Sequence, residues 1–374
     1  MDALELLSGD AQTFIDKVWA SQVHVHLAAP ADVVGLLSFD DVDHLLTSTG
    51  MRTPAVRLAQ DGAVLPSSAF TRSATLAGVS MTGLVDARKV LDLFDSGATV
   101  VLQGLHRYWP PLTRLVRELE LALGHPCQAN AYLTPPGSQG FALHSDTHDV
   151  FTFQTHGRKL WEVHDASGAR EVLMEPGTSM YLPTGTPHAA RTQAVASLHV
   201  TVGINQVTWR QVLERALASA TGAELDAHLP AGYLHDRRRF ADDVGTRLLA
   251  VAETLRDLDA ESVAAAEVER FLTTRHTAVP GGLRDRLAAR ELSDHTVLRR
   301  RPGSACQLVS DGDQLRVLLG DRELRVPARL REALEHVGAV EQLRPTDLSA
   351  WLDAESARVL TRRLVREGLL EVVG

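Results

Sequence analysis

The feature that most constrains the fold of this chain is a series of short β-type segments between about residues 128 and 206, each bounded by Gly or Pro turns. The segment VFTFQ (150–154) is rich in β-formers, and HGRKLWEVH (156–164) is typical of a hairpin with a Gly turn. The segment EPGTSMYLPTGTPH (175–188) alternates turn, short strand and turn. Such spacing is typical of a barrel or a double-sheet jelly roll, which brings distant strands together around an open mouth.

Three residues in this region form a candidate metal site. On a β-strand, residues i and i+2 share a face, so His144 and Asp146 would present an imidazole and a carboxylate side by side. With His188 they give two histidines and one carboxylate, the ligand set of non-haem Fe(II) oxygenases. The chain has 16 His and 47 Asp and Glu, so about two His-x-acid triplets are expected by chance. From spacing alone, two surface histidines on a β-domain are an equally good interpretation.

Length and composition narrow the class of protein. The 374 residues suffice for two or three domains, and 44% hydrophobic and 23% charged residues are ordinary for a globular protein. A net charge of −9 argues against a general nucleic-acid or membrane binder. Cys127 and Cys306 match no disulfide or CxxC framework, and the acidic N-terminus does not resemble a signal peptide. No apolar run approaches the length of a membrane span, so we expect a cytoplasmic protein.

The region before residue 128 mixes helices and strands. Apolar residues recur at helical spacing over 3–20, with Ser8 or Asp10 as possible N-caps. A hairpin is expected over 54–65, turning at Asp61-Gly62. The other expected elements are strands over 23–28 and 98–104 and helices over 40–50, 86–97 and 110–124.

The pattern changes at Thr208. From there to about residue 290 the period is helical, apart from a loop over 226–240, and the apolar stripes favour either an oligomerisation module or a cap on the barrel. Residues 299–305 are interpreted as a linker. The final part, from about 306, has strands, two helices and a terminal strand, which resembles a winged-helix module. Its last helix carries both basic and acidic residues, so a protein-interaction or structural role is as well supported as DNA binding: Arg358, Arg362, Arg363, Arg366, Glu355 and Glu367.

The run NAYLTPPGSQGFALHSDTHDVFTFQTHGRKLWEV (130–163) resembles the JmjC-type ribosomal oxygenases, a branch of the 2-oxoglutarate-dependent hydroxylases in the cupin superfamily. The resemblance rests on Asn-x-Tyr-x-Thr-Pro-Pro, Ser-Gln-Gly, His-x-Asp, Val-Phe-x-x-Gln and Gly-Arg-Lys-x-Trp in that order, followed by Pro187-His188 and SLHVTVG. LPAGYL (229–234) resembles a short loop in the family's dimerisation region. The implied fold is α+β: a double-stranded β-helix JmjC barrel (1–207), a helical dimerisation domain (208–297) and a C-terminal winged-helix domain (298–374).

The resemblance also implies a chemistry. Fe(II) would be held by His144, Asp146 and His188, and 2-oxoglutarate and O₂ would be co-substrates that yield succinate and CO₂. Lys159, one of only three lysines, would hold the far carboxylate of 2-oxoglutarate. The other implied pocket residues are Asn130 and His199, at co-substrate contacts, and Tyr132 and Thr134, in the pocket lining. The implied partners are a second copy of the chain and a polypeptide substrate, with an arginine or histidine of a ribosomal protein favoured.

Departures from the family pattern leave the substrate open. Leu143 and Ser145 replace the Pro and Tyr that family members often carry, and near 98–104 there is no basic residue at the place where some members carry one. Three further histidines, His148, His156 and His164, are candidates for ligation or substrate contact, with plain surface residues as the alternative. The same chemistry on a free amino acid or natural-product peptide, and a non-catalytic cupin and winged-helix regulator, are the rival hypotheses. A zinc hydrolase is disfavoured because it leaves Lys159 unexplained.

Overall fold

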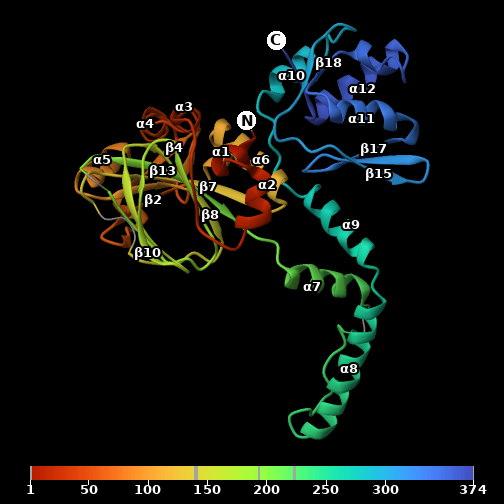
Figure 1. The fold of residues 1–374 in the computed structure, drawn as a ribbon, viewed down its shortest axis with the longest axis horizontal. Helices are drawn as coiled ribbons and strands as arrows, with labels where there is room; N and C mark the ends of the chain where they lie inside the picture. Colours follow the sequence, from red (N-terminus) through yellow and green to blue (C-terminus); the bar gives the residue numbers. More distant parts are fainter. Residues whose placement is uncertain (1, 139–141, 193, 222–224, 374) are drawn as a thin grey trace.

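The computed structural model describes residues 2–138, 142–192, 194–221 and 225–373. The chain forms a β-barrel, a helical arm that extends away from it, and a C-terminal α+β unit (Figure 1). Of the predicted Ser-Gln-Gly motif at 138–140, only Ser138 lies within the described residues.

Two antiparallel sheets form the barrel, which confirms the predicted cupin-type fold. The larger has eight strands in the order β1-β11-β8-β13-β7-β6-β2-β3, and the smaller has three in the order β10-β9-β12. The strands of the larger sheet are β1 (His24–Leu27), β2 (Val56–Gln60), β3 (Ala63–Val64), β6 (Thr99–Leu102), β7 (Cys127–Thr134), β8 (Asp149–His156), β11 (Thr178–Leu182) and β13 (Ser197–Ile204). Those of the smaller are β9 (Lys159–Asp165), β10 (Gly168–Met174) and β12 (His188–Thr192).

The larger sheet is covered on both faces, so its central strands are buried almost without interruption. Along β8, Phe151 and Phe153 join the main hydrophobic core, whereas Val150 lines a cavity inside the barrel. The core also contains apolar residues of the helices α1 (Ala3–Ser8), α4 (Phe39–Ser48) and α6 (Pro110–Leu123). Strand alternation thus sends apolar side chains outward to the helices and leaves the inward positions for a site.

The predicted hairpin over 156–164 is wrong. Strand β8 pairs with β11 and β13, whereas β9 pairs with β10 and β12, so Gly157 turns the chain from one sheet to the other. Gly157 has φ +62, and a Cβ there would lie 1.8 Å from the Ala196 carbonyl oxygen. Only glycine fits this corner.

The helices and strands before residue 128 largely agree with those predicted from the sequence. The hairpin at Asp61-Gly62 is confirmed, with φ of 50° and 79° at the two turn residues. The region 3–20 is broken, however, into α1, α2 (Ala11–Thr13) and a π-helical turn over Phe14–Val18. The break falls at Gly9, whose φ is 87°, and Asp10 caps α2 by accepting from the Thr13 N–H.

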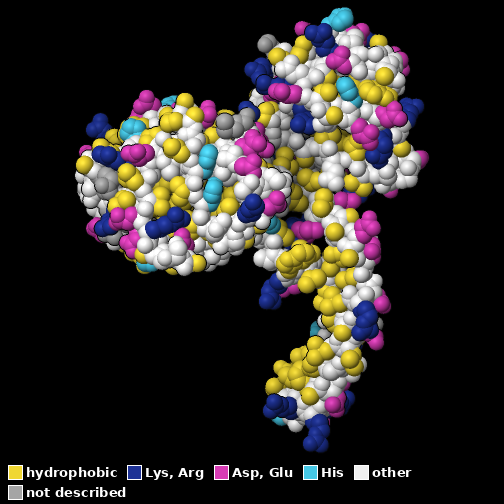
Figure 2. All heavy atoms as spheres, viewed as in Figure 1, with side chains coloured by type: hydrophobic (Ala, Val, Ile, Leu, Met, Phe, Trp, Pro, Cys, Tyr) yellow, Lys and Arg dark blue, Asp and Glu magenta, His cyan; other side chains and the backbone are white. Residues whose placement is uncertain are grey.

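Helices α7 (Trp209–Ala220), α8 (Arg237–Asp257) and α9 (Ala260–Phe271) form the arm. The predicted loop over 226–240 ends earlier, because Asp236 caps α8 and residues 237–240 are helical. Helix α8 contains no buried residue, and apolar side chains lie along one side of the arm (Figure 2). Among the described helices, none has the length and apolar character needed to cross a membrane.

The C-terminal unit begins before the expected boundary. Helix α10 (Gly282–Ala288) packs on α12 (Ala354–Glu367) and β19 (Leu370–Val372), so we propose a boundary ahead of α10 rather than at 298. The unit also holds α11 (Arg331–Ala339), β14 (Leu298–Arg300), β15 (Gln307–Asp311), β16 (Gln314–Leu318), β17 (Glu323–Pro327) and β18 (Gln342–Leu343).

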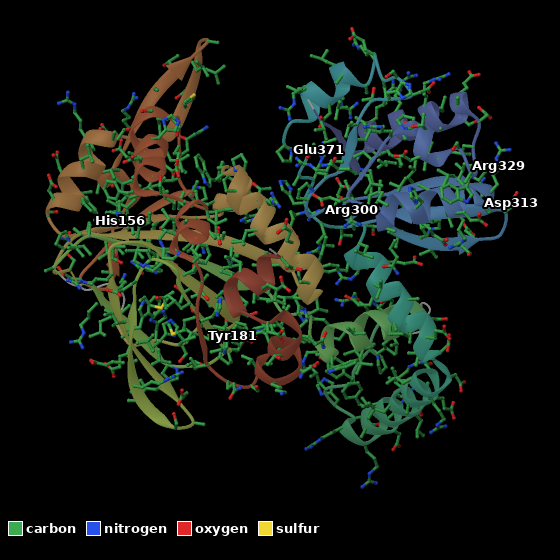
Figure 3. All side chains as sticks on the ribbon, turned by 45° about the horizontal axis from the view of Figure 1, so that its top comes forward. His156, Tyr181, Arg300, Asp313, Arg329 and Glu371 are labelled. Carbon is green, nitrogen blue, oxygen red and sulfur yellow. The ribbon has the colours of Figure 1, made fainter. Side chains whose placement is uncertain are left out.

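Residues 299–305 are not a linker. Strand β14 pairs with β18 and β19, and Arg301 is buried in ion pairs with Asp285 and Glu371. Arg300 and Glu371 lie within this unit, whereas His156 and Tyr181 lie in the barrel (Figure 3). Composition suggested a linker because it does not reveal that Arg301 has carboxylate partners elsewhere in the chain.

Candidate active site

The three predicted metal ligands come together at one end of the barrel. Residues 143–148 form no regular strand, contrary to the expectation for His144 and Asp146. His144 instead makes an isolated bridge with His188, the first residue of β12, through reciprocal backbone hydrogen bonds of 2.8 and 3.1 Å. The Asp146 carbonyl accepts from the Gly185 N–H at 2.9 Å. Backbone hydrogen bonds therefore hold the segment with His144 and Asp146 against the segment with His188.

The ligand atoms of the three side chains lie within 4.8 Å of one another. The two imidazole rings are 4.5 Å apart, and His188 Nε2 is 3.7 Å from Asp146 Oδ2. His144 is exposed and His188 is buried, so the cluster opens to solvent on one side.

Backbone carbonyls set the tautomer of both histidines. Nδ1 of His144 lies 2.8 Å from the Ala142 carbonyl, and Nδ1 of His188 lies 2.9 Å from the Thr186 carbonyl. A carbonyl only accepts, so each Nδ1 carries the proton and each Nε2 keeps a lone pair. Burial lowers the pKa of His188, which favours the neutral ring that binds metals. This arrangement suits a divalent metal ion.

A cavity of about 130 Å³ extends from the cluster into the barrel. Its lining is rich in histidine and neutral polar groups contributed by both sheets. The lining residues are Thr99, Gln128, Asn130, Tyr132, His144, Asp146, His148, Val150, Lys159, Trp161, Leu182, His188, Ala190, His199, Thr201 and Gly203.

Lys159 is the buried cation of this cavity, with 3% of its surface exposed. Its Nζ donates to Thr134 Oγ1 at 3.1 Å, and no carboxylate pairs with it among the described residues. Desolvation lowers its pKa to about 7. A buried ammonium with donors to spare is the environment that an anionic ligand group would complete.

Three of the other predicted residues surround Lys159. His199 is buried, its ring stacks on Tyr132 at 5.0 Å, and its Nδ1 has no hydrogen-bond partner among the described residues. Burial, and secondarily the charge of Lys159, lower the pKa of His199 well below its usual value. Thr134 holds Lys159 but does not itself line the cavity.

Asn130 lies in the middle of β7, on the cavity side. Its Oδ1 accepts from the Gly104 N–H at 2.9 Å. A backbone N–H is a donor, so the amide oxygen must be the bound atom, and the NH₂ group is left available.

Of the three further candidate histidines, one lines the cavity and the other two are not among its lining residues. His148 lines the cavity. His164 pairs with Glu162 at 2.7 Å, and His156 packs on Phe39. Sequence reasoning missed Gln128, Thr201 and Trp161 as lining residues, although their alternation with Asn130, His199 and Lys159 on the same strands would have indicated them.

Comparison with known proteins finds relatives of this chain. A family model described as a JmjC domain matches residues 107–171 and 163–212. Ribosomal oxygenase 1 of Rattus norvegicus is 30% identical over 238 residues, covering 54% of this chain and 40% of the rat protein. The chain thus matches the JmjC domain model over residues 107–212 and is similar to ribosomal oxygenases over about half of its length.

Another relative, from Branchiostoma floridae, is named bifunctional lysine-specific demethylase and histidyl-hydroxylase NO66. It is 33% identical over 185 residues, which cover 47% of this chain and 30% of that protein. The chain therefore spans less than half the length of these JmjC relatives. The match to the family model, over residues 107–212, lies in the part that carries the cavity.

Solved ribosomal oxygenase structures extend the likeness in fold. The ribosomal oxygenase YcfD of Escherichia coli has a TM-score of 0.54 and 18% identity, covering 98% of this chain and 99% of that chain. A second YcfD structure, with the same TM-score, identity and coverage, is a complex with cobalt and 2-oxoglutarate. At this identity the likeness concerns the fold alone, and it extends beyond the JmjC barrel.

Proposed function

We propose that this protein is an Fe(II)- and 2-oxoglutarate-dependent oxygenase that hydroxylates a side chain of a ribosomal protein or another polypeptide. One observation carries the proposal: a His-Asp-His cluster and a buried lysine without a carboxylate partner line the same cavity. The cluster alone would fit several metals. The lysine adds a requirement for an anion beside the metal, which a 2-oxo acid with a second carboxylate satisfies.

The residues present fit both groups. His144, Asp146 and His188 would hold Fe(II), since both histidines already point a lone-pair nitrogen away from a backbone carbonyl. Lys159 would hold the distal carboxylate of 2-oxoglutarate, and the available NH₂ of Asn130 offers a further donor. When bound, Fe(II) and 2-oxoglutarate supply the activation of O₂, with release of succinate and CO₂.

The chain's own residues supply orientation and exclusion of water. Thr134 fixes the direction of the Lys159 ammonium, and the stacked rings of Tyr132 and His199 form a wall beside it. Trp161 lies between His188 and His199, with ring distances of 5.7 and 5.4 Å, and closes the space between the metal cluster and the lysine. These contacts keep the lysine end dry and leave the His144 side open for a substrate.

Anaerobic titration tests the proposal. Purified protein receives Fe(II) and then 2-oxoglutarate while the visible absorption is followed, and a charge-transfer band of the chelate is expected. In Lys159→Met, which removes the charge and keeps the length, the band should require far more 2-oxoglutarate. Lys89→Met is the matched control, because Lys89 is exposed on α5 (Ala87–Asp95) and donates to the Thr71 carbonyl. No band, with iron not retained, would favour a ligand-binding regulator instead.

A polypeptide target is tested separately. Ribosomal proteins isolated from cells with and without the active protein should differ by one oxygen atom on one side chain, located by mass spectrometry. If only free amino acids or short natural-product peptides gain oxygen, the ribosomal assignment is wrong while the chemistry stands.

The arm is proposed to mediate dimerisation. Leu249 and Trp209 are 69% and 82% exposed, and the neighbouring Leu248 is also exposed. Exposed apolar side chains gathered on one side of an arm (Figure 2) are typical of a protein–protein interaction site. Light scattering should report a dimer that Leu248→Glu with Leu249→Glu converts to a monomer. Asp243→Lys is the control, because the exposed residue 243 lies about 140° around the helix from residue 248 and about 120° from residue 249.

The C-terminal unit is proposed to be a winged-helix module without a nucleic-acid partner. Three of the four arginines of α12 already have partners in the chain. Arg358 pairs with Asp294 at 2.6 Å and Arg363 with Glu367 at 2.7 Å, while Arg362 donates to the Ala289 carbonyl. Binding to random duplex DNA at low salt is expected to be undetectable.

A further inference from the structure

Strand β7, which contributes Asn130 to the cavity, is paired along only part of one edge. On one side β13 pairs with its whole length. On the other side β6 pairs only with residues 131–133. The N–H groups of alternate residues point to the same edge of a strand, so those of Cys127 and Ala129 need partners that β6 does not supply.

Side chains of two other elements supply these partners. The Cys127 N–H donates to Glu120 Oε1 of α6 at 3.1 Å. The Ala129 N–H donates to His106 Nδ1 at 3.2 Å. Two side chains thus take the place of a neighbouring strand along the first half of β7.

His106 is suited to this task because it stays neutral. A backbone N–H only donates, so Nδ1 must be the acceptor and the proton lies on Nε2. Burial, and then the charge of Arg107, lower the pKa of His106 to about 4, so the acceptor is present at neutral pH. The short 3-10 helix η3 (Leu105–Arg107) that carries His106 begins after Gly104, whose N–H binds the Asn130 side chain.

Glu120 is held by two arginines from different parts of the chain. Its side chain is buried, and Arg117 of the same helix donates to its Oε2 at 3.0 Å. Arg275, in the segment after α9, lies 3.8 Å from Oε1, the oxygen that accepts from Cys127. The Arg275 N–H donates at 2.8 Å to the carbonyl of Gly320 in the C-terminal unit. The barrel, the end of the arm and the C-terminal unit therefore meet at this carboxylate.

The first half of β7 carries part of the cavity lining but none of the metal-ligand candidates. Gln128 and Asn130 lie on it and face the cavity. Residues 144–146 precede β8, His188 begins β12 and Lys159 begins β9. A displacement of this half of β7 would therefore move Gln128 and Asn130 and leave the metal cluster in place.

We infer that His106 and Glu120 are positioning residues of the active site. They fix the first half of β7, and with it Asn130, while Arg275 fixes Glu120 from the segment after the arm. This role rests on the proposed function, in which Asn130 offers a donor to 2-oxoglutarate, and adds that co-substrate affinity depends on a contact outside the barrel. Neither residue is among the described lining residues of the cavity.

Two substitutions of His106 test this role in the full chain. His106→Leu removes the acceptor, whereas in His106→Asn the amide oxygen takes the place of Nδ1. Co(II) replaces Fe(II) so that no oxidation occurs, and visible absorption follows metal binding and then 2-oxoglutarate binding. His106→Leu should bind Co(II) as the wild type does and 2-oxoglutarate about tenfold more weakly. His106→Asn should recover most of this loss.

Three results would overturn the role of His106. One is an unchanged 2-oxoglutarate affinity in His106→Leu, and another is an equal loss in His106→Leu and His106→Asn. The third is a parallel loss of Co(II) affinity, because the effect would then not be confined to β7.

The ion pair of Glu120 with Arg275 is tested by a double-mutant cycle. Glu120→Gln keeps an oxygen for the Cys127 N–H but removes the charge, and Arg275→Met removes the cation. Each should weaken 2-oxoglutarate binding about threefold, and the double variant should be no weaker than either, because both changes break the same pair. Glu118→Gln is the matched control, since Glu118 pairs with Arg114 on the same helix at 2.9 Å. Additive losses would overturn the link through Arg275.

Hydrogen exchange gives a measurement that needs no ligand. The Ala129 amide should exchange faster in His106→Leu and the Cys127 amide faster in Glu120→Ala, while residues 131–133, which pair with β6, keep their protection. Unchanged exchange at both amides would overturn the inference. Failure of the proposed function is distinguishable, because it would remove the 2-oxoglutarate response of the wild type and leave these exchange rates as they are.

Discussion

The Tyr181 hydroxyl donates a hydrogen bond to Asp149, and both residues are buried in the larger sheet. Asp149 also accepts from the Thr184 N–H and hydroxyl, each at 2.7 Å. The Ala20 N–H donates to the Tyr181 oxygen at 2.9 Å. Burial, and then the hydrogen bond to Asp149, raise the pKa of Tyr181 well above its usual value. Asp149 therefore ties β8 to β11 and to the turn that leads into His188.

Replacing Asp149 should lower the stability of the protein. Asp149→Ala removes the acceptor of the buried Tyr181 hydroxyl and of two donors of the exposed Thr184, and should lower the free energy of unfolding by about 2–4 kcal/mol. Tyr181→Phe leaves the Thr184 bonds intact and should cost only about 1–2 kcal/mol. Urea denaturation measures both variants. Similar losses in the two variants would mean that Asp149 is not the centre of this network.

Removal of either histidine of the cluster should abolish metal binding. His144→Ala and His188→Ala each leave two ligands, which are too few for a stable site. His164→Ala is the matched control, since His164 pairs with Glu162 outside the cavity. Co(II) titration followed by visible absorption measures the difference. Retention of tight binding in either cluster variant would contradict the assigned ligand set.

Binding of 2-oxoglutarate should weaken as the pH rises. The pKa of Lys159 is lowered to about 7 in the free protein, so the side chain is charged below that pH and neutral above it. An anion requires the charged form, so binding above pH 7 must take up a proton. The affinity of Co(II)-loaded protein should fall up to about tenfold per pH unit above that point. Calorimetry in two buffers of different ionisation enthalpy measures the proton uptake.

The same titration of Lys159→Met provides the control. This variant should bind 2-oxoglutarate weakly and without the proton uptake attributable to Lys159. A wild-type affinity that is level from about pH 6 to about pH 9 would show that the lysine stays charged throughout.

Substitution of Gly157 should be far more damaging than that of Gly185. Both glycines have positive φ, 62° and 81°, so alanine meets a similar backbone penalty of about 1 kcal/mol at each. At Gly157 the new Cβ would also collide with the Ala196 carbonyl, whereas at Gly185 it would meet open space. Thermal unfolding should give a loss for Gly157→Ala several times that for Gly185→Ala. Equal losses would argue that the sheet-to-sheet corner relaxes easily.

Much of the site could be predicted because its signals are local. His144, Asp146 and His188 are close together in the structure, and Lys159 is buried in the cavity that they line. Turn signals also worked where a few residues decide the geometry, as at Asp61-Gly62 and at Gly124, which ends α6 in the left-handed conformation.

The errors have a common cause in long-range pairing. Gly157 signals a turn, but whether β8 and β9 then pair with each other depends on strands elsewhere in the chain. Residues 299–305 have the composition of a linker, but Asp285 and Glu371 bury Arg301. Whether His148 lies in the site or on the surface was left open by the sequence, because the space that admits it is provided by Gly203, 55 positions away.

The pairing of β7 with β13 has an evolutionary consequence. Tyr132 faces His199 on one rung of this ladder, and Gln128 faces Gly203 on another. Mutations at the second rung can therefore accumulate without disturbing the residues proposed to hold the oxidising co-substrate. A lineage could change side chains at one end of the barrel while the residues proposed to hold the co-substrate are inherited unchanged.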